Sequence, residues 1–235
     1  MTRRGLAESR ESAQRLIMAG RVRVNSRPAA KPDLKVDTAV PIAIIPGAHE
    51  YASRGAYKLI AALDHFGLTV TGRYALDVGA SNGGFTDVLL RRGAAAVIAL
   101  DVGYGQLAEH LRVDPRVSVM DRTNIRHVVP KDLPYLPELV VIDTSFISLK
   151  LVLPPVLTLV TRPAEIIALV KPQFEVGKGK VGKGGVVRDD LLREAALREV
   201  LEDAARRGLD CAGSLESPIT GAAGNREYLA LFRQP

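Results

Sequence analysis

The stretch "LDVGASNGGFTD", residues 76–87, decides the fold of this 235-residue chain. It ends an apolar run at 74–78 with a glycine-rich turn, and a helix is predicted to follow over residues 83–93. Gly79 permits a tight turn, and Gly83 and Gly84 let the backbone approach a ligand before the helix begins. This order of strand, turn and helix is typical of a unit in a parallel α/β sheet.

The rest of the chain repeats this alternation. Apolar runs predict six more strands, at 96–100, 117–120, 139–143, 165–170, 209–215 and 227–232. Further helices are predicted at 106–112, around 149–159 and at 189–208. Alternating strands and helices imply parallel pairing with right-handed crossovers. We therefore predict a doubly wound, Rossmann-like α/β fold with a seven-stranded, mostly parallel sheet and an antiparallel last strand.

Composition excludes several classes of protein. The single cysteine, Cys211, rules out a disulfide framework and a cysteine-clustered metal site, and it fits a reducing compartment. No apolar segment follows Met1, so no signal peptide is predicted. The most apolar stretch, 151–160, is broken by two prolines and is too short to cross a bilayer. We predict a cytoplasmic protein, monomeric, without a membrane partner or a metal.

The charge is concentrated at the N-terminus. Residues 1–36 carry nine Lys or Arg and three Asp or Glu, which accounts for the whole net charge of +6. A basic module attached to a neutral body indicates a polyanionic partner. Within it, residues 9–20 predict a helix between Ser9 as N-cap and Gly20 as terminator, and a basic hairpin turns at Asn25 and Ser26.

The stretch "RGLAESRESAQRLIMAGRVRVN", residues 4–25, resembles an S4 RNA-binding domain with a clipped start. The resemblance implies that basic side chains here contact structured RNA. We divide the chain into an S4-like domain at 1–45, a linker at 46–53 and a body at 54–235. The predicted RNA-binding residues, including several in the body, are Arg3, Arg4, Arg10, Arg15, Arg21, Arg23, Arg54, Lys178, Lys180 and Lys183.

The turn after the first body strand indicates a nucleoside pocket. A dinucleotide fingerprint would need glycine at position 81, where Ser81 stands. Asp101 ends the second strand, 24 residues after Asp77, which suits hydrogen bonds to ribose hydroxyls, and Asp121 is placed near the adenine. The alternative is a plain strand–helix turn. The combination resembles the S-adenosylmethionine pocket of class I methyltransferases, formed by Asp77, Gly79, Ala80, Ser81, Gly83, Gly84, Phe85, Asp101 and Asp121.

A lysine follows the apolar strand 165–170, and two explanations compete. The loop "GKGKVGKG", 177–184, nearly matches a nucleotide-binding P-loop. However, Gly184 stands where a Ser or Thr must bind the metal, and the loop follows the fifth strand rather than the first. A catalytic role for Lys171 beside a polyanionic substrate is therefore the better explanation.

Charged residues lie at the ends of neighbouring predicted strands. Asp143 ends the fourth strand, Lys171 the fifth, and Glu227 opens an antiparallel last strand, while Lys58 precedes the first. A ribose 2′-hydroxyl must lose its proton as it attacks a sulfonium methyl group. Lys171 is the candidate base, and a second ammonium group from Lys58 would favour proton loss from it. Asp143 and Glu227 would orient both lysines; the alternative is a set of ordinary surface ion pairs.

At these residues the chain resembles the TlyA (haemolysin A-like) family, an S4 domain followed by an FtsJ-like methyltransferase domain. The motifs are "SRGAYKL", "DVGASNGGFTD", "DVGYGQL", "DTSFISL" and "VKPQFEVGKGKVGKGGVVRD". The resemblance implies 2′-O-methylation of cytidine in ribosomal RNA from S-adenosylmethionine, by a catalytic tetrad of Lys58, Asp143, Lys171 and Glu227. It also implies Phe146 beside the cofactor and a mobile Gly/Lys loop near substrate phosphates.

Some alternatives stay open. The clipped start and the end at Pro235 look like the short form in the family, associated with large-subunit RNA, but the small subunit is also a candidate partner. A ribosome-assembly factor with a non-catalytic methyltransferase fold would share most of these features. The family's older name suggests a membrane-active haemolysin, which no amphipathic or spanning segment supports.

Overall fold

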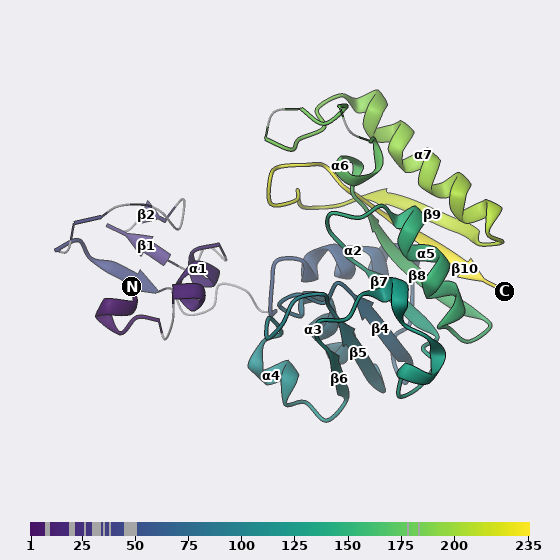
Figure 1. Ribbon diagram of the computed structural model, residues 1–235, viewed down its shortest axis with the longest axis horizontal. Coiled ribbons are helices and arrows are strands. Elements are labelled where there is room, and N and C mark those ends of the chain that lie inside the picture. The colour runs from purple at the N-terminus through teal and green to yellow at the C-terminus, as the bar shows by residue number, and fades with distance from the viewer. Residues whose placement is uncertain are drawn as a thin grey trace. The chain divides into compact units, whose positions relative to one another are not determined.

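The chain forms two compact units, Met1–Arg54 and Gly55–Pro235. The computed structural model (Figure 1) describes residues 1–7, 10–18, 22–25, 27–29, 34, 36–37, 39–44, 51–177, 179–182 and 184–235. The finer boundaries, with a linker at 46–53, stay a prediction because residues 46–50 lie outside this part of the chain.

The N-terminal unit combines one helix with a small antiparallel sheet. A 3₁₀ turn, η1 (Thr2–Arg4), precedes helix α1 (Arg10–Met18). Strand β1 (Val22–Val24) pairs with β2 (Arg27–Pro28) and with β3 (Ile42–Ile44). Ala13 in α1 and Val22 in β1 are buried. The predicted helix is confirmed over residues 10–18, and the antiparallel pairing of β1 with β2 confirms the hairpin. The predicted caps Ser9 and Gly20 lie outside the described residues.

The C-terminal unit is built on a seven-stranded sheet (Figure 1). Its order is β6-β5-β4-β7-β8-β10-β9, in which β10 runs antiparallel to both neighbours and the other neighbouring strands are parallel. The predicted mostly parallel sheet is confirmed. The strands are β4 (Tyr74–Val78), β5 (Ala96–Leu100), β6 (Val117–Met120), β7 (Leu139–Ile142), β8 (Ala164–Val170), β9 (Asp210–Glu216) and β10 (Tyr228–Gln234).

Helices cover both faces of this sheet. Alternate residues of β4, β5, β7, β8 and β10 pack with α5 (Leu149–Thr158) and α7 (Asp190–Arg206) in one apolar cluster. The intervening strand residues are also buried, on the face contacted by α2 (Ala56–Phe66) and α3 (Gly84–Arg91). Burial on both faces explains why the central strands read as continuous apolar runs rather than alternating ones.

The remaining elements are short: α4 (Glu109–Arg112), α6 (Pro172–Glu175), η2 (Ile125–His127) and η3 (Pro130–Asp132). Helix α4 is shorter than the predicted 106–112. Helix α2 was not predicted, and it matters most for the site because it carries Lys58. Its buried face places Leu59, Ala62 and Leu63 in the core, and Gly67 ends it in a left-handed conformation.

Candidate active site

The site lies at the carboxyl edge of the parallel strands. Gly79 follows β4, Asp101 follows β5, Asp121 follows β6, Asp143 follows β7 and Lys171 follows β8. Because β10 is antiparallel and Tyr228 pairs with Val170, Glu227 arrives at the same edge beside Lys171. Open α/β sheets bind their ligands at this edge.

The first ion pair joins α2 to the start of β10. Lys58 Nζ lies 2.6 Å from Glu227 Oε2, and the side chains are only 9% and 3% exposed. The other carboxylate oxygen of Glu227 accepts a hydrogen bond of 3.3 Å from Gln173 Nε2. Two fixed donors therefore hold a buried carboxylate, which is the condition under which a buried charge is tolerated.

The second ion pair joins β8 to the loop after β7. Lys171 Nζ lies 2.6 Å from Asp143 Oδ1, and it also donates to Ser145 Oγ at 2.9 Å. The Asp143 side chain is 22% exposed, so this pair reaches the surface. The pairing fixes the direction of the Lys171 ammonium at the edge of the sheet.

All four predicted tetrad residues thus lie at one edge, in two ion pairs. The contacts assign Lys58 to Glu227, so a direct influence of Lys58 on Lys171 stays a prediction. Gln173 links the pairs, since it follows Lys171 by two residues and contacts Glu227. The catalytic roles of these residues are taken up below as a proposal.

The glycine-rich turn packs closely against the second pair. Gly79 has a positive φ of 89°, and a Cβ there would lie 2.7 Å from the Asp143 backbone oxygen. Gly83 has a φ of 92°, and its Cβ would meet the Leu111 side chain at 2.3 Å. Glycine is required at both positions. Because Gly79 has no Cβ, the turn can pack against the loop that carries Asp143.

Asp77 is a buried carboxyl beneath this turn. Its Oδ2 accepts hydrogen bonds from the backbone nitrogen and the hydroxyl of Thr86, whereas its buried Oδ1 has no partner. Burial raises the pKa of Asp77 to about 7, and the charges of Asp143 and Asp101 act in the same direction, against the Thr86 hydrogen bonds. An unpartnered buried acceptor at this position marks a place where a bound group can supply a donor.

Asp101 and Asp121 have the geometry expected of a nucleoside site. Asp101 accepts from the backbone nitrogens of Ser81 and Gly103, which fixes its carboxylate between two loops. Asp121 accepts from Gly105 and from the Arg112 guanidinium. Both side chains are partly exposed and each carboxylate keeps acceptor capacity. The residues present therefore fit an adenosine.

The other predicted cofactor residues differ in accessibility. Ala80, Gly84 and Phe85 are buried, and Phe85 is only 4% exposed within α3. Phe146 is 91% exposed, has a left-handed φ of 64° and lies against the Phe174 ring with centroids 5.3 Å apart. Contact of Phe146 with a cofactor stays a prediction.

The predicted RNA-binding residues are placed unevenly. Arg3, Arg10, Arg23, Arg54 and Lys180 are exposed. Arg4 donates to the backbone oxygens of Val40 and Asp37, which gives it a structural role. Arg21, Lys178, Lys183 and the Arg15 side chain lie outside the described part of the chain.

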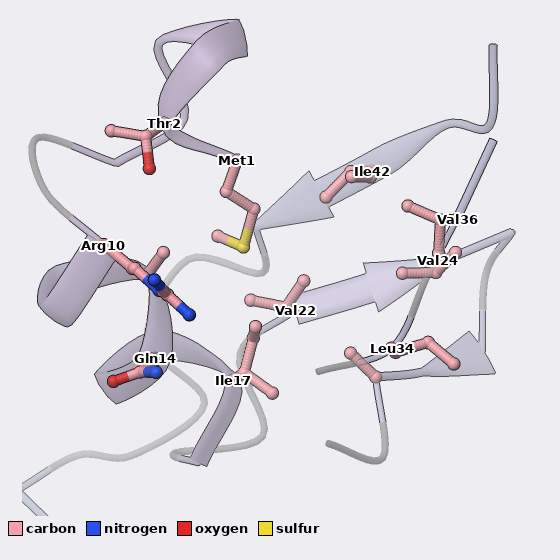
Figure 2. Close-up of a pocket in the computed structure, with 12 residues that line it drawn as sticks. Met1, Thr2, Arg10, Gln14, Ile17, Val22, Val24, Leu34, Val36 and Ile42 are labelled. Atoms are coloured by element: carbon pink, nitrogen blue, oxygen red, sulfur yellow. The ribbon is translucent and has the colours of Figure 1, made fainter. Parts of the chain in front are cut away.

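A cavity of about 200 Å³ lies inside the N-terminal unit (Figure 2). Apolar side chains from α1 and the sheet line it, among them Ile17, Val22 and Ile42, with Arg10 and Gln14 on one side. Among the described residues its lining is mainly apolar, whereas a nucleoside site needs several convergent polar groups. We assign it to the interior of this unit rather than to catalysis.

Two absences apply to the described residues alone. Among them, no group of three His, Cys, Asp or Glu side chains could hold a metal ion. Within the same ranges, the structure has no helix with the length and apolar character that a bilayer span requires.

Sequence reasoning missed the residues that hold the charged ones in place. Ser145, Gln173 and Thr86 each contact a predicted site residue. The sequence held a signal for two of them, because Ser145 lies two residues after Asp143 and Gln173 lies two residues after Lys171. Both are ordinary polar residues whose role depends on a tertiary contact.

Comparison with known proteins agrees with this geometry. The sequence profile of the FtsJ-like methyltransferase family matches residues 51–234, and that of the S4 domain matches residues 1–39. The chain is 50% identical over 234 residues to the 16S/23S rRNA (cytidine-2′-O)-methyltransferase TlyA of Mycobacterium tuberculosis, covering 99% of this chain and 87% of the relative.

Solved structures give the same result. A protein from Streptococcus thermophilus that carries the name hemolysin is 41% identical, with a TM-score of 0.80 over 97% of this chain and 84% of that one. The N-methyltransferase NodS from Bradyrhizobium japonicum, solved with S-adenosyl-L-homocysteine, shares the fold at 15% identity, with a TM-score of 0.54 over 74% of this chain and 85% of that one. The chain therefore belongs to the TlyA (haemolysin A-like) family, in which an S4 domain precedes an FtsJ-like methyltransferase domain.

Proposed function

We propose that this protein transfers a methyl group from S-adenosylmethionine to the 2′-hydroxyl of a cytidine in ribosomal RNA. The observation that carries the proposal is the pair of Lys–carboxylate contacts, Lys58 with Glu227 and Lys171 with Asp143, at the carboxyl edge of a methyltransferase sheet. The activity in the name of the Mycobacterium tuberculosis relative supports it.

The residues that would bind the cofactor are those that fit an adenosine at the carboxyl ends of the strands. Asp101 would accept from the ribose hydroxyls, Asp121 would lie near the adenine, and the turn from Gly79 to Gly84 would approach the rest of the molecule with its backbone. When bound, S-adenosylmethionine supplies an electrophilic methyl group. Asp101 and Asp143 place negative charge at this edge, which favours a cationic ligand.

The chemistry of the transfer requires a base and a fixed nucleophile. A bound S-adenosylmethionine would supply the methyl group that the 2′-oxygen takes as the carbon–sulfur bond breaks, and the neutral amine of Lys171 would accept the hydroxyl proton. Asp143 and Ser145 hold that nitrogen in one direction. Holding the hydroxyl in line with the methyl group supplies much of the remaining acceleration.

Lys58 and Glu227 have an orienting role in this proposal. Their buried contact ties α2 to β10, and through Gln173 it reaches the segment that begins with Lys171. The positive charge of Lys58 would also stabilise negative charge developing on the 2′-oxygen.

RNA would be held by basic side chains of both units. In the N-terminal unit we assign Arg3, Arg10, Arg15, Arg21, Arg23 and Arg54, and in the C-terminal unit the Gly/Lys loop with Lys178, Lys180 and Lys183. We propose that the protein acts as a monomer in the cytoplasm, where ribosomal subunits are assembled. The large subunit is the favoured target and the small subunit the alternative.

A competing proposal is an RNA-binding assembly factor without catalysis. It would account for the S4 domain but not for the buried Lys58–Glu227 pair beside a second Lys–carboxylate pair, because unused buried charges carry a desolvation cost. The name hemolysin of the Streptococcus relative belongs to that protein, and no membrane-spanning helix among the described residues supports it here.

The test uses purified protein, ribosomal RNA or ribosomal subunits, and S-adenosylmethionine with a labelled methyl group. We expect label on a cytidine 2′-oxygen, detected as a ribose that resists alkaline cleavage, and no label with Lys171→Ala. Transfer to a base, or equal transfer by Lys171→Ala, would contradict the proposal. RNA binding without transfer by the wild type would favour the assembly factor.

A further inference from the structure

Glu175 is a buried acid that the proposed chemistry does not use. It ends α6, four residues after Lys171, and is only 9% exposed. Its Oε1 accepts a hydrogen bond of 2.8 Å from the backbone nitrogen of Leu149, and its Oε2 accepts one of 2.5 Å from the Ser148 hydroxyl. Both oxygens are therefore committed to a distant part of the chain.

Those contacts place the carboxylate at the N-terminus of α5. Leu149 is the first residue of that ten-residue helix and Ser148 is its N-cap, whose hydroxyl also accepts from the backbone nitrogen of Lys150. The first backbone N–H groups of a helix have no partner inside it, and negative charge there is favourable. In most helices a nearby residue supplies this cap, whereas Glu175 supplies it from 26 positions along the chain.

The cap has a consequence for the open end of the site. The loop between β7 and α5 carries Asp143 and Ser145, the two partners of Lys171, and it ends at the residues that Glu175 holds. The loop and the segment Lys171–Glu175 are thus joined at both ends, by Lys171 at one and Glu175 at the other. A loop fixed at two points cannot move its Asp143 end independently.

We propose that Glu175 is a positioning residue, which holds the Asp143–Ser148 loop against Lys171 so that Lys171 meets the ribose hydroxyl in one orientation. The charged neighbours of Glu175 are Lys150 on α5 and Glu199 on α7, which pair with each other at 2.7 Å. Because Lys150 is paired with Glu199, the role of Glu175 depends on its two hydrogen bonds at the N-terminus of α5. This inference rests on the proposed methyl transfer.

The test compares Glu175→Met, which removes both acceptors at similar volume, with Glu175→Gln, which keeps one acceptor for Leu149 and an amide group to face Ser148. We expect Glu175→Met to lower kcat about 10- to 100-fold with KM for RNA and cofactor changed less than about threefold, because misplacement of a catalytic group is felt in the reacting geometry. Glu175→Gln should restore kcat to within about threefold of wild type.

A matched control lies in β8, the strand that leads to Lys171, near its opposite end. Glu165 in β8 forms an ion pair with Arg73, far along the strand from Lys171. Glu165→Gln should lower the unfolding temperature without changing kcat. If Glu175→Met behaves like this control, with stability lowered and kcat kept, Glu175 is structural only and the inference is wrong.

A second readout does not depend on methyl transfer. Hydrogen–deuterium exchange of residues 143–149 should be faster in Glu175→Met, about tenfold or more at Leu149, and close to wild type in Glu175→Gln. Unchanged exchange in both variants would overturn the inference even if the wild type is active. Faster exchange in Glu175→Met than in the wild type, together with a wild type that shows no transferase activity, would support the tie and reject the proposed function. Ser148→Ala provides the same test from the other side if Glu175→Met does not fold.

Discussion

The ion pairs Lys58–Glu227 and Lys171–Asp143 have the same length of 2.6 Å but different surroundings. Lys171 and Glu227 lie next to the neighbouring strands β8 and β10. Lys58 and Glu227 are 9% and 3% exposed, and Gln173 occupies the remaining oxygen of Glu227. Lys171 is equally buried, but its partner Asp143 is 22% exposed and its second contact, Ser145, lies at the surface. We call Lys58–Glu227 the closed pair and Lys171–Asp143 the open pair.

The difference separates two tasks that lysines can perform in one site. In the closed pair, burial makes the contact rigid and makes either charge costly to leave alone. In the open pair, partial exposure leaves room for a substrate group to approach the same nitrogen. A Lys–carboxylate pair can therefore either hold the structure of the site or take part in proton transfer, depending on how exposed it is.

The largest expected effect concerns the open pair. Lys171→Met keeps the apolar length of the side chain and removes the proton acceptor. We expect the rate of methyl transfer to fall about 100- to 10,000-fold, the usual contribution of a positioned acid or base. The rate is measured in a single turnover with labelled cofactor, so that product release does not mask it.

The same variant should have a small effect on folding. Because Asp143 is partly exposed, loss of its partner should lower the unfolding free energy by only about 1 kcal/mol. Urea denaturation measures this value. A large loss of stability together with a modest loss of rate would reverse the assignment of the two pairs.

The second effect concerns the closed pair. Lys58→Met leaves the Glu227 carboxylate buried without its ammonium partner, and we expect the unfolding free energy to fall by about 3–5 kcal/mol. Adding Glu227→Gln removes the stranded charge and should recover part of this loss. Stability equal to that of wild type in the single variant would show that the closed pair does not hold the fold.

A third prediction concerns Asp77, the buried carboxyl whose pKa is raised to about 7 from an ordinary value of 3.8. Between these values the folded state keeps a proton that the unfolded state releases, so Asp77 favours folding at low pH and this contribution is lost as the pH rises toward 7. Asp77→Asn should remove the dependence, which amounts to about 1 kcal/mol per pH unit. Urea denaturation at several pH values from 4.5 to 8 checks it, and parallel curves for both proteins would count against the raised pKa.

The smallest effect concerns the N-terminal unit. Arg3→Ala and Arg10→Ala should each weaken RNA binding by about tenfold or less and reduce the slope of log affinity against log salt by about one, as loss of a phosphate contact does. Arg4→Ala is the comparison, because its guanidinium holds the backbone of Val40 and Asp37 and its loss should reduce stability instead. Titrations at several salt concentrations distinguish the two. Unchanged salt slopes for Arg3 and Arg10 would count against RNA binding at these positions.

The sequence was sufficient for the sheet and for the edge at which the charges meet. The β4 to β8 strands follow the chain in repeated strand–helix units, and parallel strands place their ends together, so Asp143 and Lys171 could be expected side by side. The antiparallel β10 was also expected, and it explains why Glu227, far along the chain, arrives there.

The sequence pattern did not predict which charged side chain contacts which. Helix α2 lies ahead of the first sheet strand and carries Lys58 on a face that only packing against the core defines. The assignment of Lys58 to Glu227, the link through Gln173 and the cap from Glu175 all join segments far apart in sequence. Such contacts depend on the angles at which helices cross the sheet, which local periodicity does not determine.

The most direct measurement is a double-variant comparison of the two pairs. Single-turnover methyl transfer is measured for Lys58→Met, Lys171→Met and the variant with both changes, at a temperature where all three are folded. If the pairs form one catalytic unit, removing Lys58 should matter little once Lys171 is gone, and the double variant should equal Lys171→Met within about threefold. Rate losses that multiply would show that the two lysines act independently and would contradict a single centre.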